Sequence, residues 1–267
     1  MSRFSVVAPG RYDETLYAGS AEYYARGRMP YPQALADALR DELGLDGSGR
    51  LLDVGCGPGP LTHLLAPLFA EAVGVDADAG MVRVAERDSA PNERFVQLRA
   101  EQLPAGLGTF RVVTLAQSFH WFETEEVART LHGMLVQTGA LVHVGATTHE
   151  GDGNVPRDEI RELIHRWLGP ELRAGQGVRV MKPGADHRVL FDRVGLRNRR
   201  ELEVERDERV ERSEDVVVAS VFSQSFSAPH LFGEHVGEFE AELRALLHGR
   251  GPFFEHPRSI TLTVWEA

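Results

Sequence analysis

Apolar positions in the first half of the chain follow two alternating patterns. Short, mostly apolar runs such as Leu51–Val54 and Ala72–Val75 are each followed by a stretch in which apolar residues recur every three or four positions. Continuous runs are typical of strands covered on both faces, and the second pattern is typical of amphipathic helices. We expect strands over Leu51–Val54, Ala72–Asp76, Phe95–Leu98, Arg111–Leu115 and Leu141–Val144, and helices over Gln33–Leu45, Leu61–Phe69, Met81–Arg87 and Glu125–Leu135. This alternation predicts an α/β fold whose parallel sheet has helices on both faces.

The pattern is less regular in the second half of the chain. Apolar residues recur at helical spacing over Ile160–Leu168 and Phe239–Leu247. Strand-like alternation is found over Leu196–Glu205 and Ile260–Trp265. Val216–Phe226 is largely apolar, and its pattern fits a helix or a strand equally well. Because no linker is long enough to separate two autonomous domains, we expect a single domain with a helical insertion.

Composition narrows the class of protein without identifying it. The 267 residues are 42% hydrophobic and 26% charged, which is ordinary for a folded protein and excludes disorder as the main state. Asp and Glu (40) outnumber Lys and Arg (29), and the resulting net charge of −11 disfavours binding to nucleic acid. The single cysteine excludes an internal disulfide, and no apolar run approaches the roughly 20 residues of a membrane span. The N-terminus also lacks a signal-peptide pattern, so we expect a soluble cytoplasmic protein.

A glycine-rich turn follows the first predicted strand, in the run Leu51-Leu52-Asp53-Val54-Gly55-Cys56-Gly57-Pro58-Gly59-Pro60-Leu61. Glycines let the backbone take positive φ and approach a ligand closely, and the carboxyl end of a strand is where open α/β sheets bind ligands. Pro60 stands where a dinucleotide-binding turn needs its third glycine, which disfavours a nicotinamide oxidoreductase. Asp76 follows at the end of the second strand, where a carboxylate can accept both hydroxyl groups of a ribose. A helix cap or a solvated strand end is the alternative for Asp76.

Four segments together resemble the class I S-adenosylmethionine-dependent methyltransferases. They are LLDVGCGPG, VGVDADAGM, RAEQLP and VVTLAQSFHWF, and the similarity covers about Tyr23 to Val144. The resemblance is to small-molecule enzymes of methyltransferase type 11, UbiE-like and trans-aconitate methyltransferase-like, which are common in bacteria. Pro58 departs from the family, in which Thr or Ser is more usual.

The resemblance implies a fold, a cofactor and an organisation of the chain. It implies a Rossmann-like, seven-stranded, mostly parallel sheet with a helical lid insertion, and S-adenosyl-L-methionine as cofactor. We expect one domain over 1–267, with an N-terminal helical cover over 1–45, a cofactor-binding core over 46–150, and an acceptor lid with closing strands over 151–267. The partner implied is a small-molecule acceptor, with neither nucleic acid nor membrane, for a monomer or homodimer.

The resemblance also implies which residues bind the cofactor. They are Tyr24, Arg28, Asp53, Gly55, Cys56, Gly57, Gly59, Asp76, Ala77, Met81, Ala100, Glu101, Gln117 and Ser118. Asp76 is expected to bind the ribose and Met81 the adenine face, although Met81 at helical spacing also fits ordinary core. Arg28 is expected to bind the methionyl carboxylate, with a solvated loop charge as the alternative. Asp53 is expected to hold the loop or to meet the methionyl ammonium. A nucleophilic role for Cys56 is disfavoured because no activating partner is evident.

His120 is the candidate general base. It lies a few residues after the fourth predicted strand, and its near-neutral pKa suits deprotonation of an alcohol, phenol or ammonium acceptor. The alternative is a histidine that caps the next helix or packs beside Trp121. Phe119, Trp121 and Phe122 are expected either to line the pocket or to belong to the core. No metal-ligand spacing is present, so we expect no metal.

The leading hypothesis is methyl transfer from S-adenosylmethionine to an O, N or C atom of a small-molecule metabolite. The alternative keeps the cofactor but not the transfer, as in a cyclase or rearrangement enzyme. A noncatalytic binding protein is a further hypothesis. The segments Gly151–Val194 and Glu214–Phe254, with several serines and His230, suit an acceptor lid or routine helix packing equally well.

Overall fold

The computed structural model describes residues 5–6, 15–121, 125–170, 173–174, 177–178 and 187–267. The chain divides into two compact units, each built from separate stretches of sequence. We call them the sheet unit (Tyr31–Ala146, Met181–Glu205 and Ser259–Ala267) and the helical unit (Met1–Pro30, Thr147–Val180 and Arg206–Arg258). These bounds differ from the predicted ones at 45 and 150, because the helix after Tyr31 and both closing strands belong to the sheet unit. Whether the chain acts as one domain over 1–267 stays a prediction.

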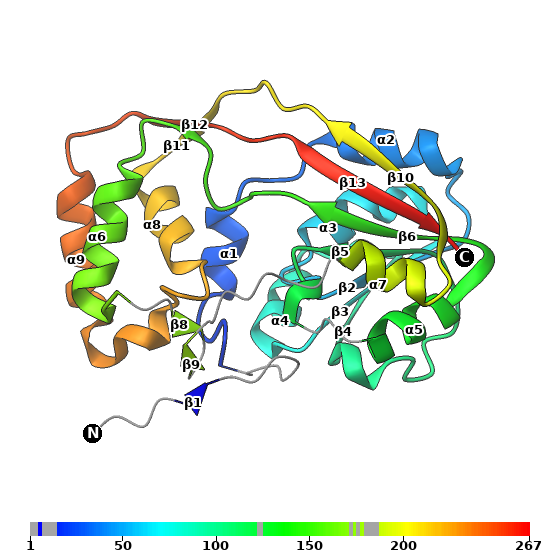
Figure 1. Ribbon diagram of the computed structural model, residues 1–267. Coiled ribbons are helices and arrows are strands. Elements are labelled where there is room, and N and C mark those ends of the chain that lie inside the picture. Colours follow the sequence, from blue (N-terminus) through cyan, green and yellow to red (C-terminus); the bar gives the residue numbers. More distant parts are fainter. Residues whose placement is uncertain (1–4, 7–14, 122–124, 171–172, 175–176, 179–186) are drawn as a thin grey trace. The chain divides into compact units, whose positions relative to one another are not determined.

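The sheet unit is built on a seven-stranded sheet in the order β10-β13-β6-β5-β2-β3-β4 (Figure 1). Its strands are β2 (Arg50–Val54), β3 (Glu71–Asp76), β4 (Glu93–Gln97), β5 (Phe110–Ala116), β6 (Leu135–Gly145), β10 (Arg197–Val204) and β13 (Ile260–Glu266). Strands β2 to β6 pair in parallel, and β13 is antiparallel to both β6 and β10. The predicted α/β fold with a mostly parallel, seven-stranded sheet is therefore confirmed. The chain reverses direction across the sheet between β2 and β5, and such a switch point is where open α/β sheets bind ligands.

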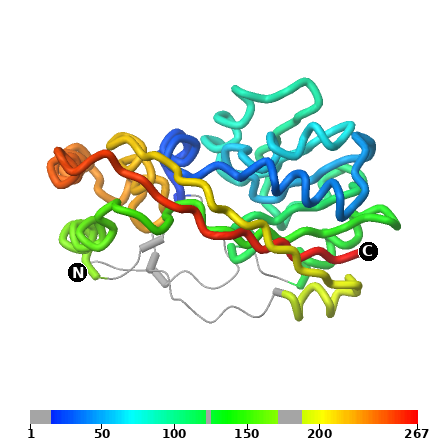
Figure 2. Tube along the Cα trace, turned by 90° about the horizontal axis from the view of Figure 1, so that it is seen from above, coloured from blue at the N-terminus to red at the C-terminus, as the bar shows by residue number. Residues whose placement is uncertain are grey.

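Helices cover both faces of this sheet, because successive strand residues point to opposite sides. Leu51 packs in the cluster that includes helix α2 (Gln33–Leu43) and helix α3 (Pro60–Leu65), whereas Leu52 packs in the cluster that includes α5 (Glu125–Gly133) and α7 (His187–Arg193). Figure 2 shows α2 and α7 on opposite sides of β10 and β13. The remaining helical elements of the unit are α4 (Ala79–Arg87) and the short 3-10 turns Ala66–Leu68, Ala100–Gln102 and Phe119–Trp121.

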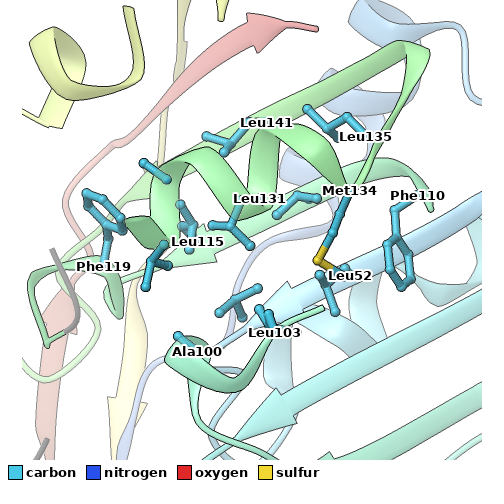
Figure 3. Close-up of a cluster of buried hydrophobic side chains, with 14 of the residues drawn as sticks. Leu52, Ala100, Leu103, Phe110, Leu115, Phe119, Leu131, Met134, Leu135 and Leu141 are labelled. Carbon is cyan, nitrogen blue, oxygen red and sulfur yellow. The ribbon is translucent and has the colours of Figure 1, made fainter. Parts of the chain in front are cut away.

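The core beneath α5 shows how the sequence pattern becomes packing. Leu131 on α5, Leu115 on β5 and Leu141 on β6 are each fully buried and lie together in one cluster (Figure 3). Phe119 lies at one end of the same cluster, and its ring centroid is 4.7 Å from that of Phe191. Each buried leucine of this kind stabilises the fold by about 1.5–3 kcal/mol relative to an exposed one.

The helical unit contains α1 (Ala21–Gly27), α6 (Arg157–Leu168), α8 (Glu214–Phe222), the 3-10 segment Pro229–His235 and α9 (Val236–Leu247). The ambiguous stretch Val216–Phe226 is helical up to Phe222, where α8 ends, and the Ser213 hydroxyl caps this helix by accepting a hydrogen bond from the Val216 N–H at 3.3 Å. Helix α8 is apolar on nearly all sides because other elements of the unit cover it. Gly27 allows α1 to approach α8, since a Cβ there would lie 2.4 Å from the backbone of Ala219 and Ser220.

Two small sheets of the helical unit are absent from the sequence prediction. One joins β11 (Val210–Arg212), β12 (Phe253–His256) and β7 (Asp152–Gly153), and the other joins β1 (Ser5–Val6), β9 (Gly177–Val178) and β8 (Arg173–Ala174). Strands of two to four residues carry too few positions to show a periodic pattern. No helix in the described part of the chain is long and apolar enough to cross a membrane.

Candidate functional site

The glycine-rich turn lies between β2 and α3, beside the switch point of the sheet. Gly55, Gly57 and Gly59 all have positive φ, at 70°, 56° and 83°. A Cβ on Gly59 would lie 2.7 Å from His63 Nε2, so Gly59 is required by close packing as well as by conformation. A Cβ on Gly57 would meet nothing within 4 Å, so the backbone there borders open space. The turn is thus closely packed at Gly59 and open at Gly57, as expected of a turn whose backbone binds a ligand.

Asp76 connects the end of β3 to this turn. Its Oδ2 accepts a hydrogen bond from the Gly57 N–H at 2.8 Å, and its Oδ1 accepts one from the Asp78 N–H at 2.9 Å. Burial, together with the charges of Asp78 and Asp53, raises the pKa of Asp76 to about 6. Each oxygen keeps a lone pair, so the carboxylate has capacity for two further donors such as ribose hydroxyls.

Asp78, and not Asp76, caps the following helix. The Asp78 side chain accepts hydrogen bonds from Gly80 N–H at 2.6 Å and Met81 N–H at 3.1 Å. The alternative that Asp76 is a helix cap is therefore wrong. Asp76 and Asp78 stand only two residues apart, and the backbone path after β3 decides which of them caps α4.

Asp53 is buried inside the sheet unit, with 1% of its surface exposed. Its Oδ2 accepts a hydrogen bond from the Thr62 hydroxyl at 2.7 Å, and its Oδ1 accepts one from the Thr114 hydroxyl at 2.8 Å. Burial raises the pKa of Asp53, and the two hydroxyls partly offset this effect. The residue ties β2 to α3 and β5, which supports the predicted loop-holding role. Contact with a methionyl ammonium stays a prediction.

Cys56 packs under the turn with Val82, Ala85 and Phe95. Burial and the nearby carboxylates of Asp76 and Asp53 raise the pKa of its thiol well above the usual value. A thiol that resists ionisation is a poor nucleophile, so the structure agrees with a packing role for this side chain. The predicted cofactor contact of Cys56 stays a prediction.

The end of β5 supplies the other side of the switch point. The buried Ser118 donates its hydroxyl hydrogen to the Val54 carbonyl at 2.6 Å, which ties β5 to β2. Gln117 has a φ of 53°, a left-handed conformation that costs a non-glycine residue free energy and is often kept at functional sites. The sequence predicts both residues at the site, but it does not reveal this strain or the Ser118 hydrogen bond.

Phe119, His120 and Trp121 form one 3-10 turn with different surroundings. Phe119 is buried in the core, which agrees with the core alternative and not with a pocket wall. His120 is exposed, and its ring centroid is 4.6 Å from that of Trp121. That contact fits the packing alternative, and a role as general base stays a prediction. Phe122 lies outside the described residues.

Four of the predicted cofactor-binding residues differ in exposure. Met81 on α4 is 2% exposed and Ala100 is 7% exposed, whereas Glu101 is on the surface and Ala77 is half-buried. The burial of Met81 agrees with the alternative of ordinary core. The roles of all four toward a cofactor stay predictions.

Tyr24 and Arg28 belong to the helical unit. The Arg28 Nε donates to the Ser223 hydroxyl at 2.9 Å, its Nη2 donates to the Ser223 carbonyl at 2.7 Å, and its Cζ lies 4.4 Å from the Tyr24 ring centroid. Arg28 is therefore held in place, and the alternative of a solvated loop charge is wrong. Its predicted contact with the methionyl carboxylate stays a prediction. The described residues contain no group of three or more His, Cys, Asp or Glu side chains that could hold a metal ion.

Comparison with known proteins decides which family this turn belongs to. Residues 51–139 match a family described as "Methyltransferase domain", and this match contains the glycine turn, Asp76 and the end of β5. Residues 51–139 therefore carry the sequence of a methyltransferase domain.

Two curated proteins illustrate the extent of this similarity. An uncharacterized methyltransferase-like protein of Schizosaccharomyces pombe is 30% identical over 166 residues, or 58% of this chain and 63% of that protein. Trans-aconitate 2-methyltransferase of Rhodopseudomonas palustris is 32% identical over 149 residues, or 55% of this chain and 54% of that enzyme. The chain thus spans less than two thirds of the curated methyltransferases it matches.

A solved structure extends the likeness in fold. The YcgJ protein from Bacillus subtilis is superimposed with a TM-score of 0.50, at 18% identity, over 86% of this chain and 97% of that chain. At this identity the likeness concerns the α/β methyltransferase fold alone.

Proposed function

We propose that the protein binds S-adenosylmethionine at the glycine turn and transfers its methyl group to a small-molecule acceptor. The observation that carries the proposal is the Asp76 carboxylate, which is fixed by the Gly57 N–H at the switch point and keeps a lone pair on each oxygen. A ribose diol has two O–H donors at the spacing that a carboxylate can accept. The match of residues 51–139 to the methyltransferase domain family supports the same assignment.

The residues of the turn fit such a ligand. Gly57 borders open space, so the backbone can approach the methionyl part without a side chain in the way. When bound, S-adenosylmethionine supplies an electrophilic methyl group on a positively charged sulfur. The chain's own contribution is to fix the ribose through Asp76, to border the methionyl side with the strained Gln117, and to hold the acceptor in line with the methyl group.

The acceptor atom is an O, N or C atom of a small metabolite in this proposal. Asp53 and Asp76 make the site of the sheet unit electronegative, which suits a cationic sulfur. His120 is the residue proposed to remove a proton from the acceptor where the acceptor needs a base.

Calorimetric titration with S-adenosylmethionine, S-adenosylhomocysteine and NADH tests the cofactor assignment. We expect micromolar binding of both adenosyl ligands and none of NADH. Binding of NADH instead would contradict the proposal. With the cofactor bound, release of S-adenosylhomocysteine in a screen of small acceptors tests the methyl transfer. A product that carries no new methyl group would argue against methyl transfer.

A further inference from the structure

Two side chains of β4 lie on the closely packed side of the glycine turn. Glu93 and Phe95 stand two positions apart on this strand, so both point to the same face of the sheet. A Cβ on Gly59 would lie 3.1 Å from Phe95 Cζ, which places the aromatic ring against the turn. A Cβ on Gly74 would lie 2.6 Å from the same ring, so this glycine of β3 makes room for Phe95. The edge strand β4 thus reaches the turn across β3.

His63 on α3 packs against the same end of the turn. Its backbone N–H donates a hydrogen bond to the Gly59 carbonyl at 2.9 Å, and its ring centroid is 5.3 Å from that of Phe95. Its Nε2 atom lies 2.7 Å from the position that a Cβ on Gly59 would take. The imidazole ring therefore occupies the space beside Gly59, and its orientation decides how closely α3 and the turn can pack.

Glu93 fixes the orientation of that imidazole. Its Oε2 lies 2.6 Å from His63 Nδ1 and also accepts a hydrogen bond from the Ala90 N–H at 3.0 Å. A carboxylate only accepts hydrogen bonds, so Nδ1 carries the hydrogen of this bond, and Nε2 is the nitrogen that faces Gly59. Only 3% of the Glu93 side chain is exposed, so water competes little for this bond. The carboxylate holds one nitrogen of the ring and thereby directs the other.

The turn needs this support because its glycines have more conformational freedom than other residues. Its first part is held to β3, since the N–H groups of Gly55 and Cys56 both donate to the Val75 carbonyl, at 2.8 and 3.0 Å. Its last part is held by the Gly59 N–H, which donates to the Cys56 carbonyl at 3.1 Å, and by the packing of His63. If the turn populates its binding conformation only part of the time, the apparent affinity for a ligand falls by the same fraction.

We propose that His63 and Glu93 form a positioning pair, which keeps the glycine turn in the conformation that binds the cofactor. Glu93 orients the imidazole, and the imidazole holds Gly59, so the pair acts through the turn and not by touching the ligand. The identity of the ligand rests on the proposed function, whereas the support of the turn does not.

A single NMR signal of the full-length chain reports on the turn. Cys56 is the only cysteine among the 267 residues, so carbonyl-¹³C cysteine combined with ¹⁵N glycine labels one peptide bond, that between Cys56 and Gly57. The carbonyl of this peptide bond accepts the hydrogen bond from the Gly59 N–H, and its N–H donates to Asp76 Oδ2. The signal therefore responds to both ends of the turn.

Loss of either member of the pair should loosen the turn. We expect His63→Ala and Glu93→Ala to shift the Cys56–Gly57 signal and to speed hydrogen exchange of its N–H at least fivefold. Calorimetric titration should show at least fivefold weaker binding of S-adenosylhomocysteine by each variant. Circular dichroism melting establishes that the variants are folded, and His63→Leu, which keeps the volume but not the hydrogen bond, serves if His63→Ala is not. An unchanged signal in the folded variants would overturn the proposal.

Two further variants distinguish a pair from two independent packing residues. Glu93→Gln keeps an oxygen that can accept both hydrogen bonds, so its affinity for S-adenosylhomocysteine should stay within about twofold of the wild type. The double variant of His63→Ala and Glu93→Ala should bind no more weakly than His63→Ala alone, because Glu93 acts through His63. Losses of affinity that multiply in the double variant would contradict the pair.

Arg50→Gln is the matched control for general stability. Arg50 pairs with Glu71 at 2.6 Å, the same distance as in the positioning pair, but it stands at the opposite end of β2 from the turn. We expect this variant to melt at a lower temperature and to keep both the Cys56–Gly57 signal and an affinity within about twofold of the wild type. Equal losses of affinity in Arg50→Gln and His63→Ala would assign the effect to general stability and overturn the proposal.

The failure of this proposal differs from the failure of the proposed function. If the wild type binds S-adenosylhomocysteine and both alanine variants bind it equally well, the positioning role is wrong and the proposed function stands. If the variants change the Cys56–Gly57 signal but the wild type binds neither S-adenosylmethionine nor S-adenosylhomocysteine, the pair supports the turn and the proposed function is wrong.

Discussion

The two units of the chain stabilise their buried charges in opposite ways. In the sheet unit, the carboxylates of Asp53 and Asp76 accept hydrogen bonds from neutral hydroxyl and backbone N–H groups. In the helical unit, Glu255 lies between the guanidiniums of Arg157 and Arg212, and Arg28 has no carboxylate partner among the described residues. Neutral donors orient a carboxylate and leave its charge in place, whereas opposite charges cancel.

This contrast separates charge that serves the fold from charge that is available to a ligand. The carboxylate of Asp76 accepts hydrogen bonds only from backbone N–H groups and has unused hydrogen-bonding capacity. The charge of Glu255, in contrast, is balanced by the guanidiniums of Arg157 and Arg212. The Asp76 carboxylate of the sheet unit is therefore suited to a ligand with hydroxyl donors. Four measurements test this distinction, from the largest expected effect to the smallest.

Glu255→Gln should lower the free energy of unfolding by about 3–5 kcal/mol, because it leaves two buried guanidiniums without their counter-charge. Urea unfolding followed by circular dichroism measures this change. Glu159→Gln is the matched control, because Glu159 pairs with Arg250 on the surface, with half of its side chain exposed. The control should change stability by less than about 1 kcal/mol. Similar losses in the free energy of unfolding for both variants would contradict the structural role assigned to Glu255.

Thr114→Val should lower the free energy of unfolding by about 1–3 kcal/mol, because the buried Asp53 loses one of its two hydroxyl donors. The same urea experiment applies, with Thr138→Val on the exposed part of β6 as control. The loss in free energy of unfolding caused by Thr114→Val should be smaller at acidic pH. Burial raises the pKa of Asp53 in the folded state, and protonation removes the charge that needs the donor. If Thr114→Val destabilises the protein equally at pH 4 and pH 7, the result would argue against a charged Asp53.

Asp76→Ala should weaken binding of S-adenosylhomocysteine by about 1–3 kcal/mol, the scale of leaving polar partners unpaired. Calorimetric titration measures the loss. Asp88→Ala is a control, because Asp88 is an exposed carboxylate at the end of α4. Unchanged affinity of Asp76→Ala would place the ribose elsewhere.

The affinity for S-adenosylhomocysteine should also depend on pH through the pKa of Asp76, which is about 6. The carboxylate is the form that accepts two hydroxyl donors, so affinity should fall by about tenfold between pH 7 and pH 5. Because the folded-state pKa lies above the unfolded value, this group stabilises the fold less as pH rises from about 4 to 6, which is opposite to its effect on binding. Asp76→Asn should remove the dependence on pH, and a dependence that persists would assign it to another group.

Most of the sheet unit could be predicted from the sequence. The strands from β2 to β6 and the helices between them follow from apolar runs and helical periods, because each element buries a continuous face. The glycine turn and Asp76 could be located as well, since their spacing along one βαβ unit fixes their spacing in space. Phe119 is the counterexample within this unit, because an aromatic residue near a site looks the same in sequence whether it faces a ligand or the core.

The helical unit shows what the sequence could not give. Its strands are too short for a pattern, and Glu255 meets Arg157 across 98 positions of the chain. Thr148 and Ser223 carry no motif, so nothing in the sequence associates them with Arg28, whose side chain donates hydrogen bonds to both. The charge on Arg28 is visible in the sequence, but the neutral partners that it finds among the described residues are a property of the fold.

The sequence by itself determined the α/β architecture, the place of the ligand-binding turn and the family of the domain, because these depend on periodicity and on residues close together in the chain. The tertiary structure decided which buried charges are neutralised and which remain available to a ligand. Electrostatic interactions act through space and depend on burial, so the same aspartate or arginine is structural or functional according to the partners that folding brings to it.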